Sequence, residues 1–346
     1  MNILIVKPSS LGDIVHTFPA VHLVRCRYPD ATIVWVVNEA YVDLVGLSPD
    51  VDEVIPFHRK DWVHPARWGE VLDFVRELRE RKFDIVIDFQ GLLRSACIAL
   101  VTGAPRRIGF RAAREFASLL YTEKILLPAN VFHAVDKNLF LVRSALEIGD
   151  NVGDDSVFPP QHDAVKQAER LLRANELTGG SAIMAIAPAA RWPSKAYASD
   201  FFARVISFVA DKEPGVRCWL VGTEDEIPVG DKVIQSCADC CPVNLMGAVN
   251  LPTLIELLRR SDVLLTNDTG PMHLAAALHV PVIALFGPTD PALTGPYGKG
   301  HLVFHGSCSH WPCFEKKCPV MQQTCITEVS EEEVAKSVLN SLGRHS

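Results

Sequence analysis

The stretch at residues 261–291, SDVLLTNDTGPMHLAAALHVPVIALFGPTDP, constrains the fold of this chain more than any other. The apolar run at residues 262–266 is long enough for a strand buried on both faces of a parallel sheet. Turn residues follow it, and Pro271 suits the first turn of a helix over residues 272–279. A second apolar run at residues 281–286 completes a strand–helix–strand unit. Such a unit forms a crevice at the carboxyl ends of its strands.

The turn between that strand and that helix predicts an anion-binding site. The backbone amides of Thr269 and Gly270 would open the helix, where the peptide dipoles favour negative charge. His273 lies one helical turn further on and faces the same end. Asp268 would repel a phosphate, so its carboxylate fits better as an acceptor for sugar hydroxyls beside the phosphates. A plain capped helix, with Asp268 or Thr269 as the cap, is the alternative.

The same alternation continues along the chain and defines its fold class. Apolar runs typical of buried strands occur at residues 2–6, 32–37, 52–56, 84–89, 182–187 and 216–221. Helical patterns occur at residues 14–28, 68–81, 92–101, 136–147, 165–175, 201–211 and 251–260. Regular alternation of this kind predicts an α/β fold with doubly wound parallel sheets.

The chain divides into two such series. Residues 149–161, GDNVGDDSVFPPQ, are rich in Gly, Asp and Pro and are typical of a linker. A length of 346 residues also exceeds the usual size of a single hydrophobic core. We therefore predict two Rossmann-like domains, residues 1–155 and 156–346, that face each other across a central cleft. The first strand is not followed by GxGxxG, so the standard dinucleotide fingerprint is absent.

The turn after the first strand, SSLGD, is a second place where chemistry is expected. Ser10 supplies a hydroxyl, and Gly12 would let a ligand approach the backbone closely. Asp13 follows at the start of a helix. Its carboxylate either complements the helix dipole or acts as a general base at the carboxyl end of the strand. The residues alone leave both roles open.

Charge and hydropathy narrow the range of partners. The net charge is −7, and no polybasic tract favours nucleic acid. Two local basic clusters, His58-Arg59-Lys60 and the segment PRRIGFRAAR at residues 105–114, are either solvated surface or contacts for an anionic ligand. No apolar run approaches the ~20 residues of a transmembrane helix. The sequence therefore predicts a cytoplasmic protein.

Four segments together resemble a known family. KPSSLGDIVHTFPA, DFQGLLRSA, the region around Lys195 and NDTGPMHLAAALHVPVIALFGPTDP are similar, in this order, to the heptosyltransferases of glycosyltransferase family nine. The resemblance covers nearly the whole chain, and AREFASLLY with HAVDKNLFLVRSALEIG is closest to the branch that glycosylates Kdo. It implies a GT-B fold, with the acceptor bound by the first domain and the nucleotide sugar by the second. It also implies transfer of heptose from ADP-heptose to the inner core of lipopolysaccharide.

The resemblance also implies roles for individual residues. Asp13 would deprotonate the acceptor hydroxyl, and Lys195 would neutralise the leaving diphosphate. Asp268 would hold the heptose hydroxyls, and Glu226 would reach the ribose. The donor site expected from residues and resemblance together is Ser10, Gly12, Lys195, Glu226, Asp268, Thr269, Gly270 and His273. The reaction would be a single displacement with inversion, without an enzyme nucleophile, a metal or another cofactor.

The acceptor implied by the resemblance is an anionic glycolipid. Arg59, Lys60 and Arg114 would contact its carboxylates and phosphates, and the protein would associate peripherally with the inner face of the inner membrane. Two other functions fit the same pattern. One is another nucleotide-sugar-dependent glycosyltransferase of this fold that acts on a different cell-envelope glycan. The other is a non-catalytic sugar-binding protein, which would have no need of a base at Asp13.

Four cysteines are crowded near the C-terminus, in CSHWPCFEKKCPVMQQTC. Cys308, Cys313, Cys318 and Cys325 are too widely spaced for a CxxC knuckle, and a reducing compartment disfavours disulfides. Free thiols are the preferred interpretation, with a zinc site as the next. The sequence therefore assigns no metal ligand but keeps these four residues as zinc candidates.

Overall fold

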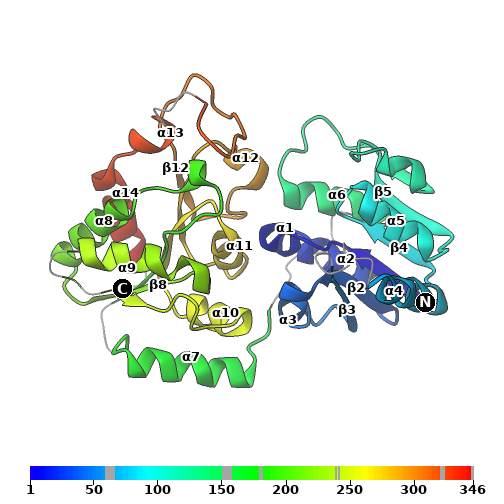
Figure 1. Cartoon of the computed structure of the whole chain (residues 1–346), viewed down its shortest axis with the longest axis horizontal. Helices are drawn as coiled ribbons and strands as arrows, with labels where there is room; N and C mark the ends of the chain where they lie inside the picture. Colours follow the sequence, from blue (N-terminus) through cyan, green and yellow to red (C-terminus); the bar gives the residue numbers. More distant parts are fainter. Residues whose placement is uncertain are drawn as a thin grey trace. The chain divides into compact units, whose positions relative to one another are not determined.

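The computed structural model describes residues 1–58, 67–149, 158–178, 182–237, 240, 242–319 and 324–343. The chain forms two compact domains, Met1–Pro159 and Pro160–Ser346. The sequence-based boundary between residues 155 and 156 lies next to this division, in a segment outside the described residues. Each domain contains one six-stranded sheet flanked by helices (Figure 1).

The first domain is built on a parallel sheet with the strand order β3-β2-β1-β4-β5-β6. Its strands are β1 (Asn2–Val6), β2 (Thr32–Asn38), β3 (Glu53–Phe57), β4 (Ile85–Asp88), β5 (Arg106–Phe110) and β6 (Glu123–Ile125). Its helices are α1 (Leu11–Val15), α2 (Phe18–Arg27), α3 (Val42–Val45), α4 (Trp68–Glu80), α5 (Leu93–Val101) and α6 (Ala134–Leu146). This strand order is that of a Rossmann sheet, and the order reverses between β1 and β4.

The second domain repeats the same topology, with the order β12-β11-β10-β7-β8-β9. Its strands are β7 (Ala182–Ala187), β8 (Val216–Leu220), β9 (Val243–Asn244), β10 (Val263–Asn267), β11 (Val282–Leu285) and β12 (Leu302–Phe304). Its helices are α7 (His162–Ala174), α8 (Ser199–Lys212), α9 (Ile227–Ser236), α10 (Leu251–Arg259), α11 (Gly270–Ala277), α12 (Pro291–Thr294), α13 (Thr324–Thr327) and α14 (Glu331–Leu342). Its order reverses between β7 and β10.

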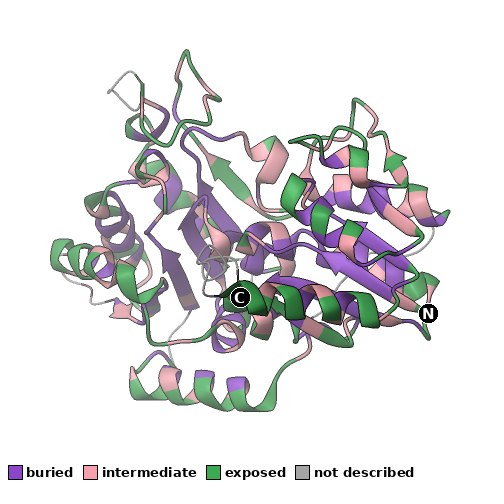
Figure 2. Cartoon of the chain, turned by 45° about the vertical axis from the view of Figure 1, so that its right-hand side comes forward, coloured by how far each residue is buried: buried purple, intermediate pink, exposed green. Residues whose placement is uncertain are grey.

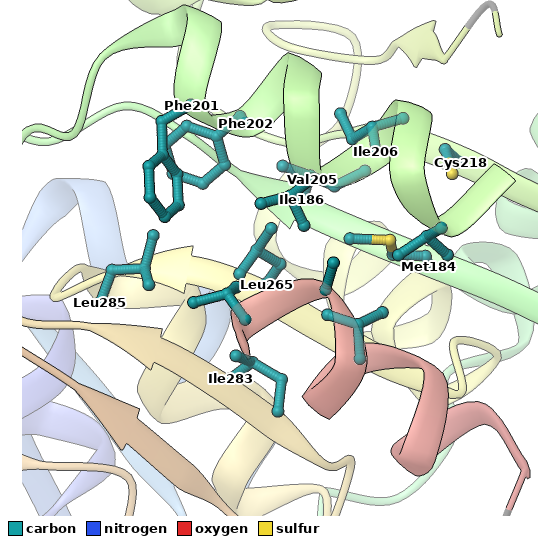
Figure 3. Packing of buried hydrophobic residues seen from close by; sticks show 14 of the residues in the cluster. Met184, Ile186, Phe201, Phe202, Val205, Ile206, Cys218, Leu265, Ile283 and Leu285 are labelled. Carbon is teal, nitrogen blue, oxygen red and sulfur yellow. The ribbon is translucent and has the colours of Figure 1, made fainter. Parts of the chain in front are cut away.

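Burial follows the layers of each domain. The central strands are buried on both faces, and the helices expose only their outward sides (Figure 2). In the second domain, α8 packs its apolar side on the sheet (Figure 3), where Phe202 and Val205 approach Ile186 and Leu265. These four side chains are completely buried. At about 25 cal/mol per Å² of buried apolar surface, such packing is the main source of stability for the domain.

The structure corrects several expectations about elements. The helix expected over residues 14–28 is two helices, because the chain turns at His16 and Thr17 and Pro19 occupies the first turn of α2. Four edge or near-edge strands, β5, β6, β9 and β12, were not expected. Three of them, β6, β9 and β12, have only two or three residues. In β5, RRIGF, only Ile108 and Gly109 are buried. Such strands do not show the apolar run typical of a central parallel strand.

Candidate active site

Asp13 lies in α1, just after the turn that follows β1. This is the switch point of the first sheet, where the strand order reverses between β1 and β4. Ser10 donates from both its backbone amide and its hydroxyl to Asp13 Oδ2, at 2.9 and 2.7 Å. The carboxylate side chain is 41% exposed. Asp13 therefore complements the start of α1, as the dipole interpretation requires. It also keeps an accessible carboxylate, as a general base requires, so both roles open in the sequence are compatible with the geometry.

A buried lysine lies directly beside this carboxylate. Lys7, which is 7% exposed, donates from Nζ to the Phe89 carbonyl at 3.1 Å and lies 3.9 Å from Asp13 Oδ1. Burial lowers the pKa of its ammonium, while the carboxylates of Asp13 and Asp88 act in the opposite direction. The guanidinium of Arg114 lowers this pKa further. Lys7 was not assigned a role from the sequence, although it is the polar residue that ends the first apolar run.

Asp88 lies at the same switch point, at the carboxyl end of the neighbouring strand β4. It is the last residue of β4, is 0% exposed and pairs in register with Val6. Burial raises the pKa of its carboxyl, although hydrogen bonds oppose this shift. The Tyr121 hydroxyl donates to Oδ2 at 2.6 Å, and the Gln90 amide donates to Oδ1 at 2.8 Å. Asp88 and Tyr121 were missed because a single acid at the end of a strand carries no motif of its own.

The predicted acceptor cations fall into three groups. Arg59 and Lys60 lie outside the described residues. Arg114 is exposed, and its backbone amide bonds the Gly91 carbonyl at 3.0 Å, near the carboxyl end of β4. In the basic segment, Arg106 pairs with Glu123 at 2.6 Å, and Arg107 donates to the Leu120 carbonyl at 3.0 Å.

Consequently half of the basic cluster at residues 105–114 has a structural role. Arg106 and Arg107 join β5 to its surroundings in the first domain, whereas Arg111 and Arg114 have exposed side chains. The exposed pair is therefore the part of the cluster that can meet an anionic ligand.

In the second domain, Lys195 and Asp268 meet at the switch point. Lys195 ends the short 3₁₀ turn η5 (Pro193–Lys195) after β7, and Asp268 follows β10. Lys195 Nζ lies 2.5 Å from Asp268 Oδ2, and the Thr289 hydroxyl donates to the same oxygen at 2.7 Å. The Lys195 side chain is 18% exposed and that of Asp268 is 5% exposed. Lys195 Nζ also lies over the ring of Trp192, 4.8 Å from the ring centroid.

This arrangement pairs the buried carboxylate with a cation that keeps part of its side chain exposed. Asn267 holds the two loops together, because its Nδ2 donates to the Pro188 carbonyl at 2.7 Å. Thr289 was not expected from the sequence as a partner of Asp268. The signal for it was present, since GPTDP ends the strand next to β10 and so reaches the same edge of the sheet.

The helix α11 begins where the sequence predicts the anion site. Thr269 is its N-cap and Pro271 lies in its first turn. The Thr269 hydroxyl lies 3.2 Å from the hydroxyl of Thr266 and donates to the Asn267 carbonyl at 3.3 Å, rather than capping the helix amides. His273 is buried, at 8% exposed. The helix start can therefore offer amides to a phosphate, beside the Lys195 ammonium.

Glu226 lies at the carboxyl end of β8, the strand next to β7. It ends the 3₁₀ turn η6 (Glu224–Glu226), and its Oε2 accepts from the Thr223 amide at 2.8 Å. The carboxylate thus belongs to a capping box. Its place on the same sheet edge is consistent with the expected ribose contact, which stays a prediction.

The four C-terminal cysteines are free thiols and line one pocket. Burial raises the pKa of the Cys325 thiol, and its three neighbours Cys308, Cys318 and Cys313 raise it further. In the part of the chain that the structure describes, no three Cys, His, Asp or Glu side chains form a ready-made metal site.

Two Rossmann-like domains, with an accessible carboxylate at one switch point and a lysine beside a helix N-terminus at the other, define a glycosyltransferase of the GT-B fold. A carboxylate suits proton removal from an acceptor, and a cation with helix amides suits a diphosphate leaving group. The chain belongs to glycosyltransferase family 9, the heptosyltransferases, whose family model matches residues 71–323.

Individual relatives agree with this assignment. The chain is 30% identical to lipopolysaccharide heptosyltransferase 1 of Pseudomonas aeruginosa, over 96% of this chain and 90% of the relative. It is also 30% identical to the enzyme of the same name from Escherichia coli K12, over 88% of this chain and 93% of the relative. Among solved structures, E. coli heptosyltransferase WaaC with ADP superposes with a TM-score of 0.77 at 27% identity, covering 99% of this chain and 100% of that chain.

Proposed function

We propose that this glycosyltransferase transfers heptose from ADP-heptose to the Kdo-containing inner core of lipopolysaccharide. The two curated relatives described above carry the name lipopolysaccharide heptosyltransferase 1. Solved relatives hold ADP and ADP-2-deoxy-2-fluoro heptose. The observation in this chain that carries the proposal is the Lys195–Asp268 pair beside the start of α11. The lysine and the helix amides suit a diphosphate, and the carboxylate suits sugar hydroxyls.

The donor is assigned to the second domain. Lys195 and the first amides of α11 hold the diphosphate, whose negative charge grows as the bond to the sugar breaks. The buried Asp268 carboxylate accepts hydrogen bonds from heptose hydroxyls, which replace part of its contact with Lys195. Glu226, at the end of β8, accepts from the ribose. ADP-heptose is a substrate in this scheme.

Proton transfer is assigned to the first domain. The acceptor hydroxyl gives its proton to Asp13, and its oxygen forms the new bond to the anomeric carbon. The bond from that carbon to the diphosphate breaks, and ADP leaves with the electron pair. A single displacement of this kind inverts the configuration at the anomeric carbon. Lys7 is a positioning residue here, since its ammonium lies 3.9 Å from Asp13 and favours the ionised carboxylate.

The acceptor is assigned to the exposed surface around Arg111 and Arg114. Guanidinium groups suit the carboxylates of Kdo and the phosphates of an inner core. Phe116 and Leu119 are 81% and 71% exposed just beyond these arginines. In the described residues no helix is long and apolar enough to cross a membrane. We propose that the protein reaches its glycolipid from the cytoplasmic side by peripheral contact through this surface.

A donor-by-acceptor matrix tests the proposal. Purified protein is incubated with ADP-heptose, a UDP-sugar or a GDP-sugar, each with a Kdo-bearing or a heptose-bearing acceptor, and nucleotide release and glycosylated product are measured. Product with ADP-heptose on the Kdo-bearing acceptor supports the proposal. Turnover that prefers another nucleotide sugar would assign the chain to a different glycan, and ADP-heptose binding without any product would indicate a sugar-binding protein.

A further inference from the structure

The cysteine-rich segment lies against the loops that carry the donor site. Between β12 and α13, residues 305–319 contain no helix or strand. The Ser194 hydroxyl donates to the Glu315 carbonyl at 2.6 Å, and the Phe314 amide donates to the Pro288 carbonyl at 3.0 Å. The Trp311 ring donates from Nε1 to the Gly287 carbonyl at 3.1 Å. The segment therefore supports the turn that ends at Lys195.

The contact between these loops is tight. A Cβ on Gly287 would come within 2.3 Å of the Ser194 carbonyl oxygen. Thr289, two residues beyond Gly287, donates to Asp268. A small displacement of the segment would thus reach both members of the Lys195–Asp268 pair.

Few apolar contacts hold this segment in place. Most of its side chains are exposed or half-buried, including Glu315, Lys316 and Lys317. A short irregular segment with so little core needs another source of order, and small domains commonly obtain it from a metal or a disulfide. Its three cysteines, Cys308, Cys313 and Cys318, are free thiols.

Four thiols from two different elements gather in space here. Cys308, Cys313 and Cys318 come from the irregular segment, whereas Cys325 comes from α13. All four line one pocket, together with His310, Ser194, Pro288 and Pro319. The gathering of four sulfur atoms around one small space is typical of soft-metal sites with tetrahedral geometry.

We propose that Cys308, Cys313, Cys318 and Cys325 bind one transition-metal ion, with zinc as the expected ion, and that this ion fixes the segment behind the donor site. The described residues contain no metal site with its ligands already in place. Neutral thiols have no reason to close on one point, and four thiolates without an ion would repel one another. Binding therefore displaces the thiol protons and draws the four sulfur atoms inward together.

Metal content of the untagged full-length protein, purified under reducing conditions, tests the proposal. We expect about one zinc ion per chain by mass spectrometry, at least tenfold less in Cys313→Ser/Cys318→Ser, and no loss in the control Cys26→Ser/Cys97→Ser, whose cysteines are exposed in the first domain. Replacement of zinc by Co²⁺ in the wild-type protein should give the visible absorption of a tetrahedral four-thiolate site. This second measurement does not depend on whether the variant folds.

The proposal would be overturned if the protein held no stoichiometric metal even after incubation with Zn²⁺ under reducing conditions. In that case all four thiols would also react freely with a thiol reagent. Disulfides among the four would overturn it equally. Iron bound by the same four thiolates would support the site. Chelation of the wild-type protein should also weaken ADP binding by about tenfold, since small misplacements in a site are costly. Metal content is independent of the proposed function, so failure of one does not imply failure of the other.

Discussion

The Lys195–Asp268 pair couples donor binding to local stability. Lys195→Met removes the ammonium and leaves a carboxylate that is 5% exposed without its cation, so the free energy of unfolding should fall by up to about 3 kcal/mol. ADP affinity should fall at least tenfold, because the diphosphate loses its cation. Denaturant titration and calorimetric ADP binding measure the two effects.

The double variant Lys195→Met/Asp268→Asn separates them. It removes the unpaired charge, so it should recover part of the stability but none of the ADP affinity. Lys212→Met, at the end of α8 and more than half exposed, serves as the control and should change neither quantity. Recovery of ADP binding in the double variant would show that Lys195 acts only by neutralising Asp268.

Lys7 should contribute to activity at a cost in stability. Burial lowers the pKa of its ammonium below 10.5, so the folded domain disfavours the charged form relative to the unfolded chain. That penalty is complete below the folded pKa and disappears as the pH rises toward 10.5. Lys7→Met should therefore unfold at higher urea concentration than wild type at pH 7, with a difference that shrinks as the pH rises, while kcat/KM falls.

The exposed Lys82, in the same domain, provides the matched control, since Lys82→Met should leave urea stability and kcat/KM unchanged. A Lys7→Met protein that is less stable at neutral pH, with normal activity, would make Lys7 a plain structural residue.

The candidate site was only partly accessible to sequence reasoning. Asp13, Lys195 and Asp268 occur in segments with turn chemistry or family resemblance, and those signals point to single positions. Lys7 and Asp88 become informative only when strands distant in sequence are placed side by side, whereas Thr289 follows the strand next to β10 and could have been found. Val6 and Asp88, for example, pair across β1 and β4. Neither strand's own sequence shows that β1 pairs with β4 rather than only with the next strand along the chain.

At the scale of elements, strongly apolar strands such as β7 and β10 agree with the sequence within a residue at either end. The short or charged strands β5, β6, β9 and β12 do not, because they lack the long apolar run that is typical of a central parallel strand. In β5 the arginines that suggested a surface cluster are instead used to bond Glu123 and backbone carbonyls. Helix breaks such as that between α1 and α2 depend on tertiary packing as well as on Pro19.

The loop after β11 offers a test of how elements position the site. Gly287→Ala would place a Cβ 2.3 Å from the Ser194 carbonyl oxygen and push the η5 turn away from Asp268. ADP affinity should fall by about tenfold, in line with the cost of small misplacements at a site. Gly69→Ala is the control, since a Cβ there meets nothing within 4 Å and replaces an exposed helical glycine. Equal ADP affinity in both variants would mean that the η5 turn does not need this contact.

At the scale of the whole molecule, peripheral contact with an anionic membrane should depend on salt. Arg111 and Arg114 are exposed, and each cation near an anionic surface contributes on the order of 1 kcal/mol. Binding to vesicles that contain anionic lipid should fall with ionic strength and in Arg111→Gln/Arg114→Gln, while ADP binding stays constant. Co-sedimentation with vesicles measures this.

The matched control for the membrane experiment is Arg106→Gln. Its guanidinium is already paired with Glu123, so its loss should lower stability rather than vesicle binding. Vesicle binding that changes neither with ionic strength nor in Arg111→Gln/Arg114→Gln would contradict electrostatic docking. Arg111 and Arg114 would then remain as acceptor contacts.

The measurement that tests the account most directly is the effect of Asp13→Asn on turnover and on ADP affinity in one preparation. Asparagine keeps the shape of the side chain and an oxygen that can accept from the Ser10 amide, so the start of α1 should persist. If Asp13 is a positioned general base, Asp13→Asn should lower kcat by about 10²–10⁴-fold and leave the dissociation constant for ADP unchanged. Turnover close to wild type would contradict the assignment and make Asp13 a helix cap. A parallel loss of ADP binding would contradict the division of labour between the two domains.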